Sequence, residues 1–399
     1  MYVFIIFIIF CKSTIFYQVF FSKFGDCCAA KIYIDFLCNF AHFFNGIEFI
    51  CKMTSHELYM QRALKLAQQG RLHVSPNPMV GCVIVHQNKI IGEGYHTQYG
   101  QAHAEVNAIN SVKNKELLKE STLYVTLEPC SHHGKTSPCA DLLIQHGIRH
   151  VYIAVSDPNP KVAGKGIEKL KENACKVEVG LLEKEAAELN KRFFCFHQKK
   201  RPYIILKWAQ TLDGYMDCNQ RDSQNRKNYW ITNEVLRIKT HQWRAEETSV
   251  FVGANTLLHD NPQLNVRYCA GKNPIRITLI NKDINQQLHF FDHTQNSIVF
   301  NYEKEEKTGA IYFCKLLKED NSYEAIVQKL YEMKIQSILV EGGQHTLENF
   351  LRLNLWDEAR ILIGNQCFGA GLRSPSIPFE PFRIDEVMGD KIVFVNNRS

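Results

Sequence analysis

The sequence predicts an α/β protein made of two units, each with a sheet that helices cover on both faces. Apolar strand patterns alternate with amphipathic helix patterns from residue 53 to the end of the chain, an order typical of α/β folds. The alternation breaks once, in the polar stretch at residues 197–202. The chain has 399 residues, enough for two domains of ordinary size, and 45% of them are hydrophobic. We therefore expect one unit at residues 53–198 and a second at 199–399.

The first unit is expected to open with an amphipathic helix, with a capping box of Thr54 and Glu57 at its start and Gly70 at its end. A later helix has Ser137 as its expected N-cap and Pro138 as its first residue. The predicted order is a helix at 53–70, two strands within 79–96, a helix at 102–113, a strand at 122–128, a helix at 137–147, a strand at 150–157, and two more helix and strand segments up to about residue 197.

The second unit contains a further series of apolar segments. Near its end, Gly342 and Gly343 follow a strand pattern and precede a helix pattern, a place where backbone N–H groups bind phosphate. The sequence has no G-x-G-x-x-G motif, so these glycines alone establish no nucleotide site. The apolar segments lie at 201–214, 250–258, 275–280, 335–343 and 358–364.

The first 52 residues differ in composition from the rest. They contain twelve of the 25 phenylalanines and neither proline nor arginine. The apolar run at residues 1–10 is too short to span a bilayer and lacks the positive start of a signal peptide. Two interpretations remain open for this extension. It is a membrane anchor, or it precedes the true start of the protein at Met53.

Charge and cysteine content limit the class of protein. The net charge of +6 is spread along the chain, whereas nucleic-acid binding usually needs a clustered basic patch. The nine cysteines beyond residue 52 form no regular disulfide framework. The charge therefore argues against nucleic acid, and the cysteines indicate a reducing compartment, which we take to be the cytoplasm. A small-molecule substrate, no membrane partner and further copies of this chain are separate expectations that do not follow from charge or cysteine content.

Four residues suggest a catalytic metal site. Cys130 and Cys139 are eight residues apart, wider than in structural zinc modules, so the pair alone is weak evidence. His103 adds a third ligand type, and three protein ligands leave a fourth position for water. Glu105, two residues from the histidine, is placed to move protons to and from that water. The order matches zinc deaminases, with a longer gap between the cysteines. The alternative is a core histidine with two inert thiols.

The sequence resembles the bifunctional deaminase–reductase family of riboflavin biosynthesis over residues 54–399. The motifs that carry the resemblance lie at 75–85, 92–109, 122–144, 157–167, 202–214, 230–232, 256–267 and 340–351. It implies a cytidine-deaminase-like three-layer α/β/α domain and a dihydrofolate-reductase-like α/β domain. The implied reactions are zinc-dependent deamination of a phosphorylated diaminopyrimidinone and reduction of its ribosyl group by NADPH.

The resemblance also implies a set of site residues. In the first unit it gives His103, Cys130 and Cys139 as zinc ligands and Glu105 as the proton shuttle. The implied substrate contacts are Asn77, His96, His132, Lys135, Asp157, Asn159, Asn228, Arg244, Leu264, Arg267 and Glu341. The implied cofactor contacts are Lys207, Gln210, Trp230, Thr256, Asp260, Gly342 and Gly343.

From the residues alone, several of these positions have plainer explanations. His132 and Lys135 are equally well explained as solvated loop residues, and Arg244 and Arg267 as surface arginines. The sequence also departs from the family pattern. Asn228 replaces a serine, and Asn261 replaces the second aspartate of an Asp-Asp-Pro motif. Two other functions remain as rivals, a nucleoside or nucleic-acid deaminase and a non-catalytic zinc module fused to a ligand-binding domain.

Overall fold

The computed structural model describes residues 10–11, 14–15, 53–131, 137–160, 162–218, 230–280, 287–318 and 322–398. The chain divides into two compact units, Met1–Ser55 and His56–Ser399. In the first, strands β1 (Phe10–Cys11) and β2 (Thr14–Ile15) pair antiparallel. Apart from these two short strands, residues 1–52 lie outside the described residues, and so do the membrane-anchor and late-start interpretations of this extension. Among the described helices, none combines the length and apolar character needed to cross a bilayer.

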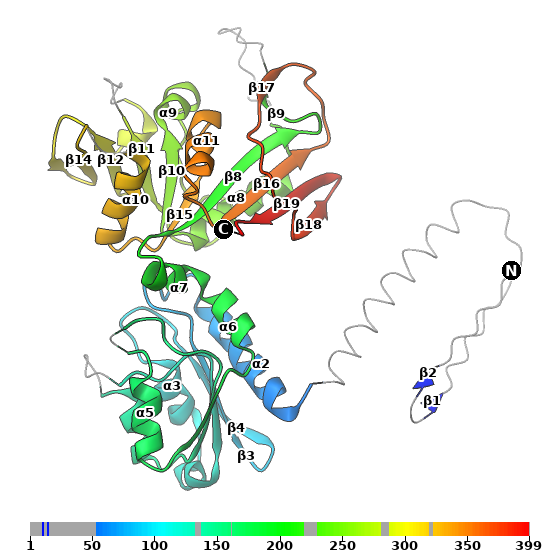
Figure 1. Cartoon of the computed structure of the whole chain (residues 1–399), viewed down its shortest axis with the longest axis vertical. Helices are drawn as coiled ribbons and strands as arrows, with labels where there is room; N and C mark the ends of the chain where they lie inside the picture. Colours follow the sequence, from blue (N-terminus) through cyan, green and yellow to red (C-terminus); the bar gives the residue numbers. More distant parts are fainter. Residues whose placement is uncertain are drawn as a thin grey trace, which may run out of the picture. The chain divides into compact units, whose positions relative to one another are not determined.

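A five-stranded sheet in the order β4-β3-β5-β6-β7 occupies the region before residue 180 (Figure 1). Its last three strands are parallel, and β3 pairs antiparallel with β4 and β5. The strands are β3 (Gly81–His86), β4 (Lys89–Tyr95), β5 (Thr122–Val125), β6 (His150–Ile153) and β7 (Lys176–Val179). The helices are α2 (Ser55–Ala67), η1 (Gln68–Gly70), α3 (Ala104–Ser111), η2 (Lys115–Glu120), α4 (Cys139–Gln145), α5 (Lys165–Glu172), α6 (Glu183–Leu189) and α7 (Lys191–Gln198).

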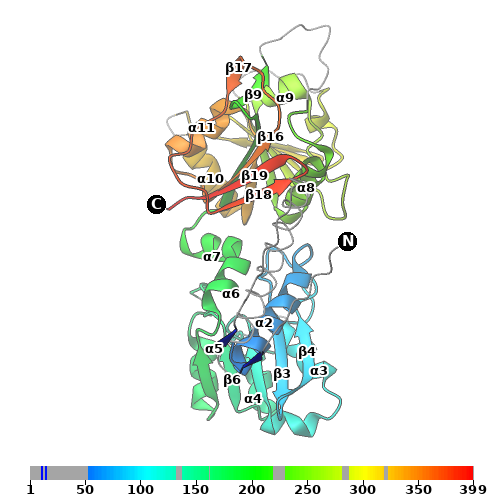
Figure 2. The ribbon, with the colours of Figure 1, turned by 90° about the vertical axis from the view of Figure 1, so that its right-hand side faces the viewer.

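Helices cover both faces of this sheet. Successive side chains of β3 point to opposite faces, and each set packs against different helices. Cys82 and Ile84 pack in a core cluster with residues of α3, α4 and α5. Val83 and Val85 pack in a second cluster with residues of α2, α6 and α7. Figure 2 shows α2 and α6 over the sheet. The predicted three-layer α/β/α arrangement is confirmed.

A ten-stranded sheet follows, in the order β13-β14-β12-β11-β10-β15-β8-β16-β19-β18. The strands from β14 to β16 in this order are parallel, and β13, β19 and β18 are antiparallel to their neighbours. The small sheet of β9 (Tyr215–Cys218) and β17 (Gly371–Arg373) lies apart from it. The ten strands are β8 (Tyr203–Thr211), β10 (Ser249–Gly253), β11 (Ile275–Leu279), β12 (Ser297–Asn301), β13 (Glu306–Thr308), β14 (Ile311–Lys315), β15 (Ser337–Val340), β16 (Glu358–Gly364), β18 (Arg383–Val387) and β19 (Asp390–Asn396).

The helices of this second region are α8 (Glu234–Glu246), α9 (Ala254–Asp260), η3 (His289–Phe291), α10 (Ser322–Glu332) and α11 (Gln344–Arg352). Two of the core clusters of this region lie on opposite faces of the sheet, since alternate residues of β8 divide between them. Ile204 and Leu206 pack with residues of α10 and α11, whereas Ile205 packs with residues of α8. The predicted α/β class is therefore confirmed for this region too.

The start of α4 differs from the sequence prediction. The helix begins at Cys139, and its N-cap is Pro138, without a side-chain capping bond. The reason is that the first helical N–H groups find partners elsewhere. The N–H of Cys139 donates to the Cys130 Sγ at 3.4 Å, and the N–H of Ala140 donates to the Cys130 carbonyl at 3.1 Å. The expected N-cap role of Ser137 was wrong.

Candidate functional site

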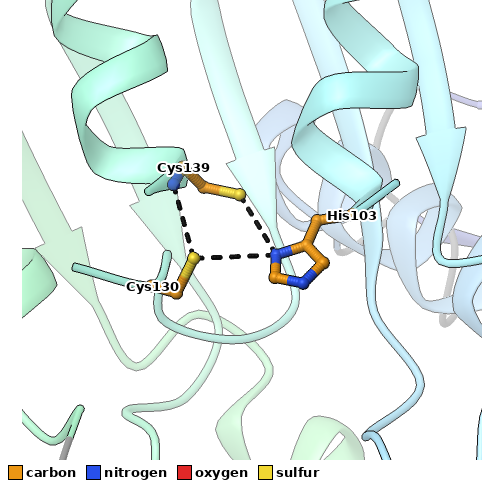
Figure 3. Close-up of side chains that lie close together, drawn as sticks. All are labelled: His103, Cys130 and Cys139. Carbon is orange, nitrogen blue, oxygen red and sulfur yellow. Dashed lines mark hydrogen bonds between the residues drawn. The ribbon is translucent and has the colours of Figure 1, made fainter. Parts of the chain in front are cut away.

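The structure brings His103, Cys130 and Cys139 together, with one ligand atom from each within 4.8 Å of the others (Figure 3). The His103 Nδ1 lies 3.3 Å from the Cys139 Sγ and 3.6 Å from the Cys130 Sγ. Three different elements supply them. His103 is the N-cap of α3, Cys130 follows β5, and Cys139 opens α4. One imidazole and two thiols around one point form a donor set suited to zinc.

The protonation of the cluster also suits a cation. Hydrogen bonds from the Cys139 side chain and from His103 lower the pKa of Cys130, and the hydrogen bond to Cys130 raises the pKa of Cys139. The two thiols therefore share one proton. To hold a divalent cation, Cys130 and Cys139 would both have to lose their protons, because cysteine binds metal as the thiolate. The backbone N–H of Cys139 also donates a hydrogen bond to the Cys130 sulfur and so stabilises its thiolate form.

Glu105 lies in the first turn of α3 and is 3% exposed. Burial and, to a smaller extent, the negative charge of the nearby Cys130 sulfur raise the pKa of its carboxyl to about 7. A carboxyl group with this pKa is able both to take and to release a proton near neutral pH.

Asn77 and His96 lie next to the metal cluster. The Asn77 Nδ2 and the His96 Nε2 are 3.1 Å apart, and the rings of His96 and His103 meet edge to face with centroids 5.6 Å apart. His96 is buried, and its Nδ1 lies 3.0 Å from the Ala102 carbonyl. Two of the implied substrate contacts are therefore beside the cluster. His132 and Lys135 lie outside the described residues.

Asp157 and Asn159 follow β6 and are tied to the Cys130 segment by Glu128. The Asp157 Oδ1 accepts the N–H of Asn159 at 2.8 Å, and the N–H of Asp157 donates to the Glu128 Oε2 at 3.2 Å. Glu128 is 4% exposed and lies two residues before Cys130. Its side chain connects the loop of the two implied substrate contacts to the loop of one implied metal ligand.

A cavity of about 300 Å³ lies in the region of the ten-stranded sheet. Its lining comes from β8, the segment before α8, α8, β10, α9, the loop after α9, the residue after β15 and β16. Eight of the implied reductase residues line it: Lys207, Trp230, Arg244, Thr256, Asp260, Leu264, Arg267 and Glu341. Asn228 lies outside the described residues.

Glu341 is the centre of a buried ion-pair cluster in this cavity. Arg244 donates to both of its carboxylate oxygens, from Nε at 2.6 Å and from Nη2 at 2.9 Å. The Lys207 Nζ lies 3.6 Å from the Glu341 Oε2. Burial opposes ionisation of Glu341, but the charges of Arg244 and Lys207 lower its pKa to about 2. The side chain of Arg244 is only 11% exposed, so the surface-arginine explanation was wrong for it.

Three implied cofactor contacts are not among the residues that line this cavity. The Gln210 Oε1 accepts the indole N–H of Trp208 at 2.8 Å. Gly342 and Gly343 connect β15 to α11, as their sequence pattern predicts. The N–H of Gly343 donates to the Thr256 Oγ1 at 3.1 Å, which links this turn to a residue that does line the cavity.

Asn261 departs from the family pattern at a position where the structure explains asparagine. It is the C-cap of α9, with φ +40° and ψ 53°, a left-handed conformation that asparagine tolerates better than most residues. Its side-chain oxygen also accepts the N–H of His289 at 2.7 Å.

Comparison with known proteins separates the chain into the same two regions of sequence. Residues 53–155 match the family described as the cytidine and deoxycytidylate deaminase zinc-binding region. Residues 202–387 match the RibD C-terminal domain. The riboflavin biosynthesis protein RibD of Aquifex aeolicus is 40% identical over 320 residues, which are 79% of this chain and 88% of that protein. The chain belongs to the RibD family.

Other RibD proteins support this assignment. RibD of Escherichia coli strain K12 is 35% identical over 335 residues, 79% of this chain and 89% of that protein. The crystal structure of a Thermotoga maritima diaminohydroxyphosphoribosylaminopyrimidine deaminase/5-amino-6-(5-phosphoribosylamino)uracil reductase covers 86% of this chain and 98% of its own, with 38% identity and a TM-score of 0.76. RibD of Acinetobacter baumannii gives a TM-score of 0.77 at 30% identity. The resemblance found in the sequence is thereby confirmed.

The cavity also contains residues of α8 that sequence analysis missed. Arg237 and His241 line it together with Arg244. His241 is 2% exposed, and burial together with the charges of Arg244 and Arg267 lowers its pKa to about 4. The three residues occur at positions i, i+4 and i+7 of one helix, a spacing that places them on the same face. The signal available in the sequence was this group of three basic residue types on one face of a predictable helix.

Proposed function

We propose that residues 53–198 deaminate 2,5-diamino-6-ribosylamino-4(3H)-pyrimidinone 5′-phosphate and that residues 199–399 reduce the ribosyl group of the product with NADPH. Membership of a family of bifunctional riboflavin biosynthesis enzymes supports both reactions. The single observation that carries the proposal is the cluster of His103, Cys130 and Cys139 with the buried carboxyl of Glu105 nearby. We also propose that the enzyme acts in the cytoplasm as a homo-oligomer.

In the deaminase, His103, Cys130 and Cys139 would hold zinc, because one imidazole and two thiolates leave a position for water. When bound, zinc lowers the pKa of that water toward ~7 and so supplies a nucleophile at neutral pH. Glu105 takes one proton from the water and gives it to the pyrimidine ring, and then takes the proton of the hydroxyl added at C2 and gives it to the leaving amine. In the balanced reaction, water enters at C2, the exocyclic C2–N bond breaks, and ammonia leaves. Asn77 and His96 are placed to orient the ring.

In the reductase, the cavity residues hold a phosphorylated ribose next to the cofactor. NADPH, when bound, supplies the hydride that reduces C1′ of the opened ribose or of its imine. Glu341 keeps Lys207 and Arg244 in fixed positions, and these cations attract and orient the substrate. The implied cofactor contacts on α9 lie next to those at Gly342 and Gly343, since the Gly343 N–H donates to Thr256 of α9.

Two variants test this division of labour. Glu105→Gln should retain zinc, because Glu105 is not a ligand, but lose deamination by roughly 10²–10⁴-fold, the contribution of a positioned acid–base group. It should still oxidise NADPH with the deaminated substrate. Lys207→Ala should release ammonia but accumulate the unreduced product. Loss of both activities in either variant, with the fold intact by circular dichroism, would contradict two separate sites.

The rival function, a non-catalytic zinc module, predicts a different outcome. It predicts zinc without ammonia release from the wild-type chain. Incubation with the phosphorylated diaminopyrimidinone, with and without NADPH, followed by mass spectrometry of the products, distinguishes the two functions. The same chain should also show a mass larger than one protomer by light scattering if the homo-oligomer proposal is correct.

A further inference from the structure

Arg237 occupies an unusual place in the wall of the reductase cavity. It comes from α8 and lines the cavity with Arg244 and Arg267. Its guanidinium lies 4.9 Å from the centroid of the Trp230 ring and 5.0 Å from that of Tyr268. Contacts with two aromatic rings favour a flat cation and restrict its orientation.

The hydrogen-bonding capacity of Arg237 is only partly used within the described residues. Its Nη2 donates to the Glu234 Oε1 at 2.9 Å, but the Glu234 side chain is 85% exposed, so this pair adds little stability. The Arg237 Nε is buried and has no hydrogen-bond partner in the described part of the chain. A buried donor without a partner is costly, which favours a ligand that supplies an acceptor.

The neighbouring arginines have different partners. Both Nε and Nη2 of Arg244 donate to Glu341. Arg267 is exposed and donates to the Asn265 side chain at 2.8 Å. Of the three arginines in the cavity wall, Arg237 is the one whose carboxylate partner is largely exposed to solvent.

The charge of the cavity fits an anionic ligand. Four cationic side chains, Lys207, Arg237, Arg244 and Arg267, and two carboxylates, Asp260 and Glu341, line it. The lining residues therefore carry two more positive than negative charges, of which the exposed Glu234 carboxylate beside Arg237 offsets one. His241 adds no charge near neutral pH, because its pKa is lowered to about 4 by burial and by nearby arginines. A phosphate monoester carries ≈ −1.5 to −2 at pH 7 and accepts forked hydrogen bonds from guanidinium groups.

We propose that Arg237 binds the phosphate monoester of a ligand in the reductase cavity and selects that ligand over its unphosphorylated form. The proposal rests on the reductase function proposed above. Two ligands of that reaction carry this group, the pyrimidine at its ribose 5′-position and NADPH at its adenosine 2′-position. The shared chemistry is a tetrahedral dianion that receives hydrogen bonds from the guanidinium group of Arg237.

The test measures equilibrium binding to the full-length chain, without turnover, by isothermal titration calorimetry. The first pair of probes is the deaminated pyrimidine 5′-phosphate and the same compound after phosphatase treatment. The second pair is NADP⁺ and NAD⁺. Arg237→Gln should weaken binding of the phosphorylated member of one pair on the order of 10- to 100-fold, the loss expected for a charge-assisted hydrogen bond, with its unphosphorylated counterpart unchanged.

Three further variants separate binding from structure. Arg237→Lys keeps the charge without the flat fork and should recover only part of the affinity. Glu234→Gln removes the competing carboxylate and should strengthen phosphate binding, whereas a purely structural Arg237–Glu234 pair predicts no gain. Arg383→Gln is the matched control, since Arg383 is also stacked on a ring, 4.5 Å from the Phe394 centroid, and paired with Asp385 away from the cavity. It should leave both pairs unchanged.

The pair that loses discrimination identifies the source of the phosphate. If the wild-type chain prefers a phosphorylated member and Arg237→Gln keeps that preference, the assignment of Arg237 is wrong while the reductase function stands. If the wild-type chain shows no preference in either pair, the proposed reductase function fails together with the assignment. Equal losses for phosphorylated and unphosphorylated members would indicate a distorted cavity and would also overturn the proposal.

Discussion

Replacing Glu128 with alanine should destabilise the deaminase region more than the usual loss of one side chain. The buried Glu128 carboxylate accepts four backbone N–H groups and, among the described residues, no hydrogen bond from a cationic side chain. One donor is Asp157, in the loop after β6. The other three open α5, so the carboxylate also lies at the positive end of that helix: Gly164 at 3.0 Å, Gly166 at 3.0 Å and Ile167 at 3.4 Å.

The expected size of the effect follows from which donors stay buried. The bonds from Asp157 and Gly166 are buried, whereas water reaches those from Gly164 and Ile167. Each buried donor left without a partner costs about 1–3 kcal/mol, so the loss should be about 2–6 kcal/mol. Water cannot easily replace the carboxylate, because α5 packs close to the Cys130 segment. A Cβ on Gly166 would lie 2.0 Å from the Pro129 carbonyl oxygen.

Hydrogen exchange measured by mass spectrometry gives the most direct assay. In Glu128→Ala, exchange should accelerate in a peptide covering residues 157–167, and the KM of deamination should rise because Asp157 and Asn159 lose their anchor. Glu128→Gln should show a smaller change, since its amide keeps one accepting oxygen. Reduction of the deaminated substrate should be unaffected and serves as an internal control for folding.

Glu93→Ala is the matched control. Glu93 is paired with Arg62 on the surface, where such a pair contributes up to about 1 kcal/mol. Unchanged exchange at residues 157–167 in Glu128→Ala would refute the reasoning. So would a stability loss no larger than that of Glu93→Ala, because the four N–H groups would then have equivalent partners in water.

Three further predictions concern the metal, acid stability and packing. Cys130→Ala should lose most of its zinc by atomic absorption, with Cys175→Ala as a control that keeps it; full metal content in the first variant would remove Cys130 from the ligand set. Burial opposes ionisation of Glu341 and Glu358, but neighbouring arginine and lysine charges lower both pKa values to about 2. These folded-state values lie below the unfolded value of ≈ 4.3, so the stabilisation, about 3 kcal/mol for each group, is complete above that pH and is lost as pH falls toward 2. All four tryptophans lie at or beyond residue 208, so urea unfolding followed by tryptophan fluorescence should show a midpoint that falls between pH 5.5 and 3, and a constant midpoint would contradict the ion-pair assignment. Gly94→Ala should impair deamination without affecting reduction, because its Cβ would lie 2.3 Å from the backbone of α3, which carries the proposed proton shuttle; an unchanged deamination rate would show that α3 can shift freely.

Up to residue 198 the sequence predicted the order of elements well, because the two periodicities change clearly there. In the second region the strands β12, β13, β14, β18 and β19 were not predicted. The strand–turn–strand at residues 79–96 became β3 and β4, with Gln87 and Asn88 at positive φ between them. The metal cluster was also predictable. His103 and Cys139 lie at helix starts and Cys130 follows a strand, as their local patterns indicated. Local patterns were sufficient for this cluster, because each of the three residues lies at or near the end of a helix or strand.

Long-range partners were not predictable from local patterns. Ser137 has the right residue type for an N-cap, yet a segment that begins nine residues before Cys139 satisfies the start of α4 instead. No local pattern marks Glu128 as a carboxylate with four backbone donors, because these donors lie 29 to 39 residues further on. The bidentate contact of Arg244 with Glu341 joins residues 97 apart. Such contacts depend on how the sheet assembles, and no pattern within one element contains them.

The buried glutamates of the two sites show how charge decides what a carboxyl group does. Glu105 is 3% exposed and the Glu341 side chain 8%, so burial differs little between them. Burial and a nearby thiol raise the pKa of Glu105 to about 7, whereas Arg244 and Lys207 outweigh burial and lower that of Glu341 to about 2. Glu341 therefore stays ionised near neutral pH and cannot donate a proton there. The proton that accompanies hydride in the proposed reduction has to come from another group or from water. The role left for Glu341 is to hold two cations at a fixed distance from the substrate.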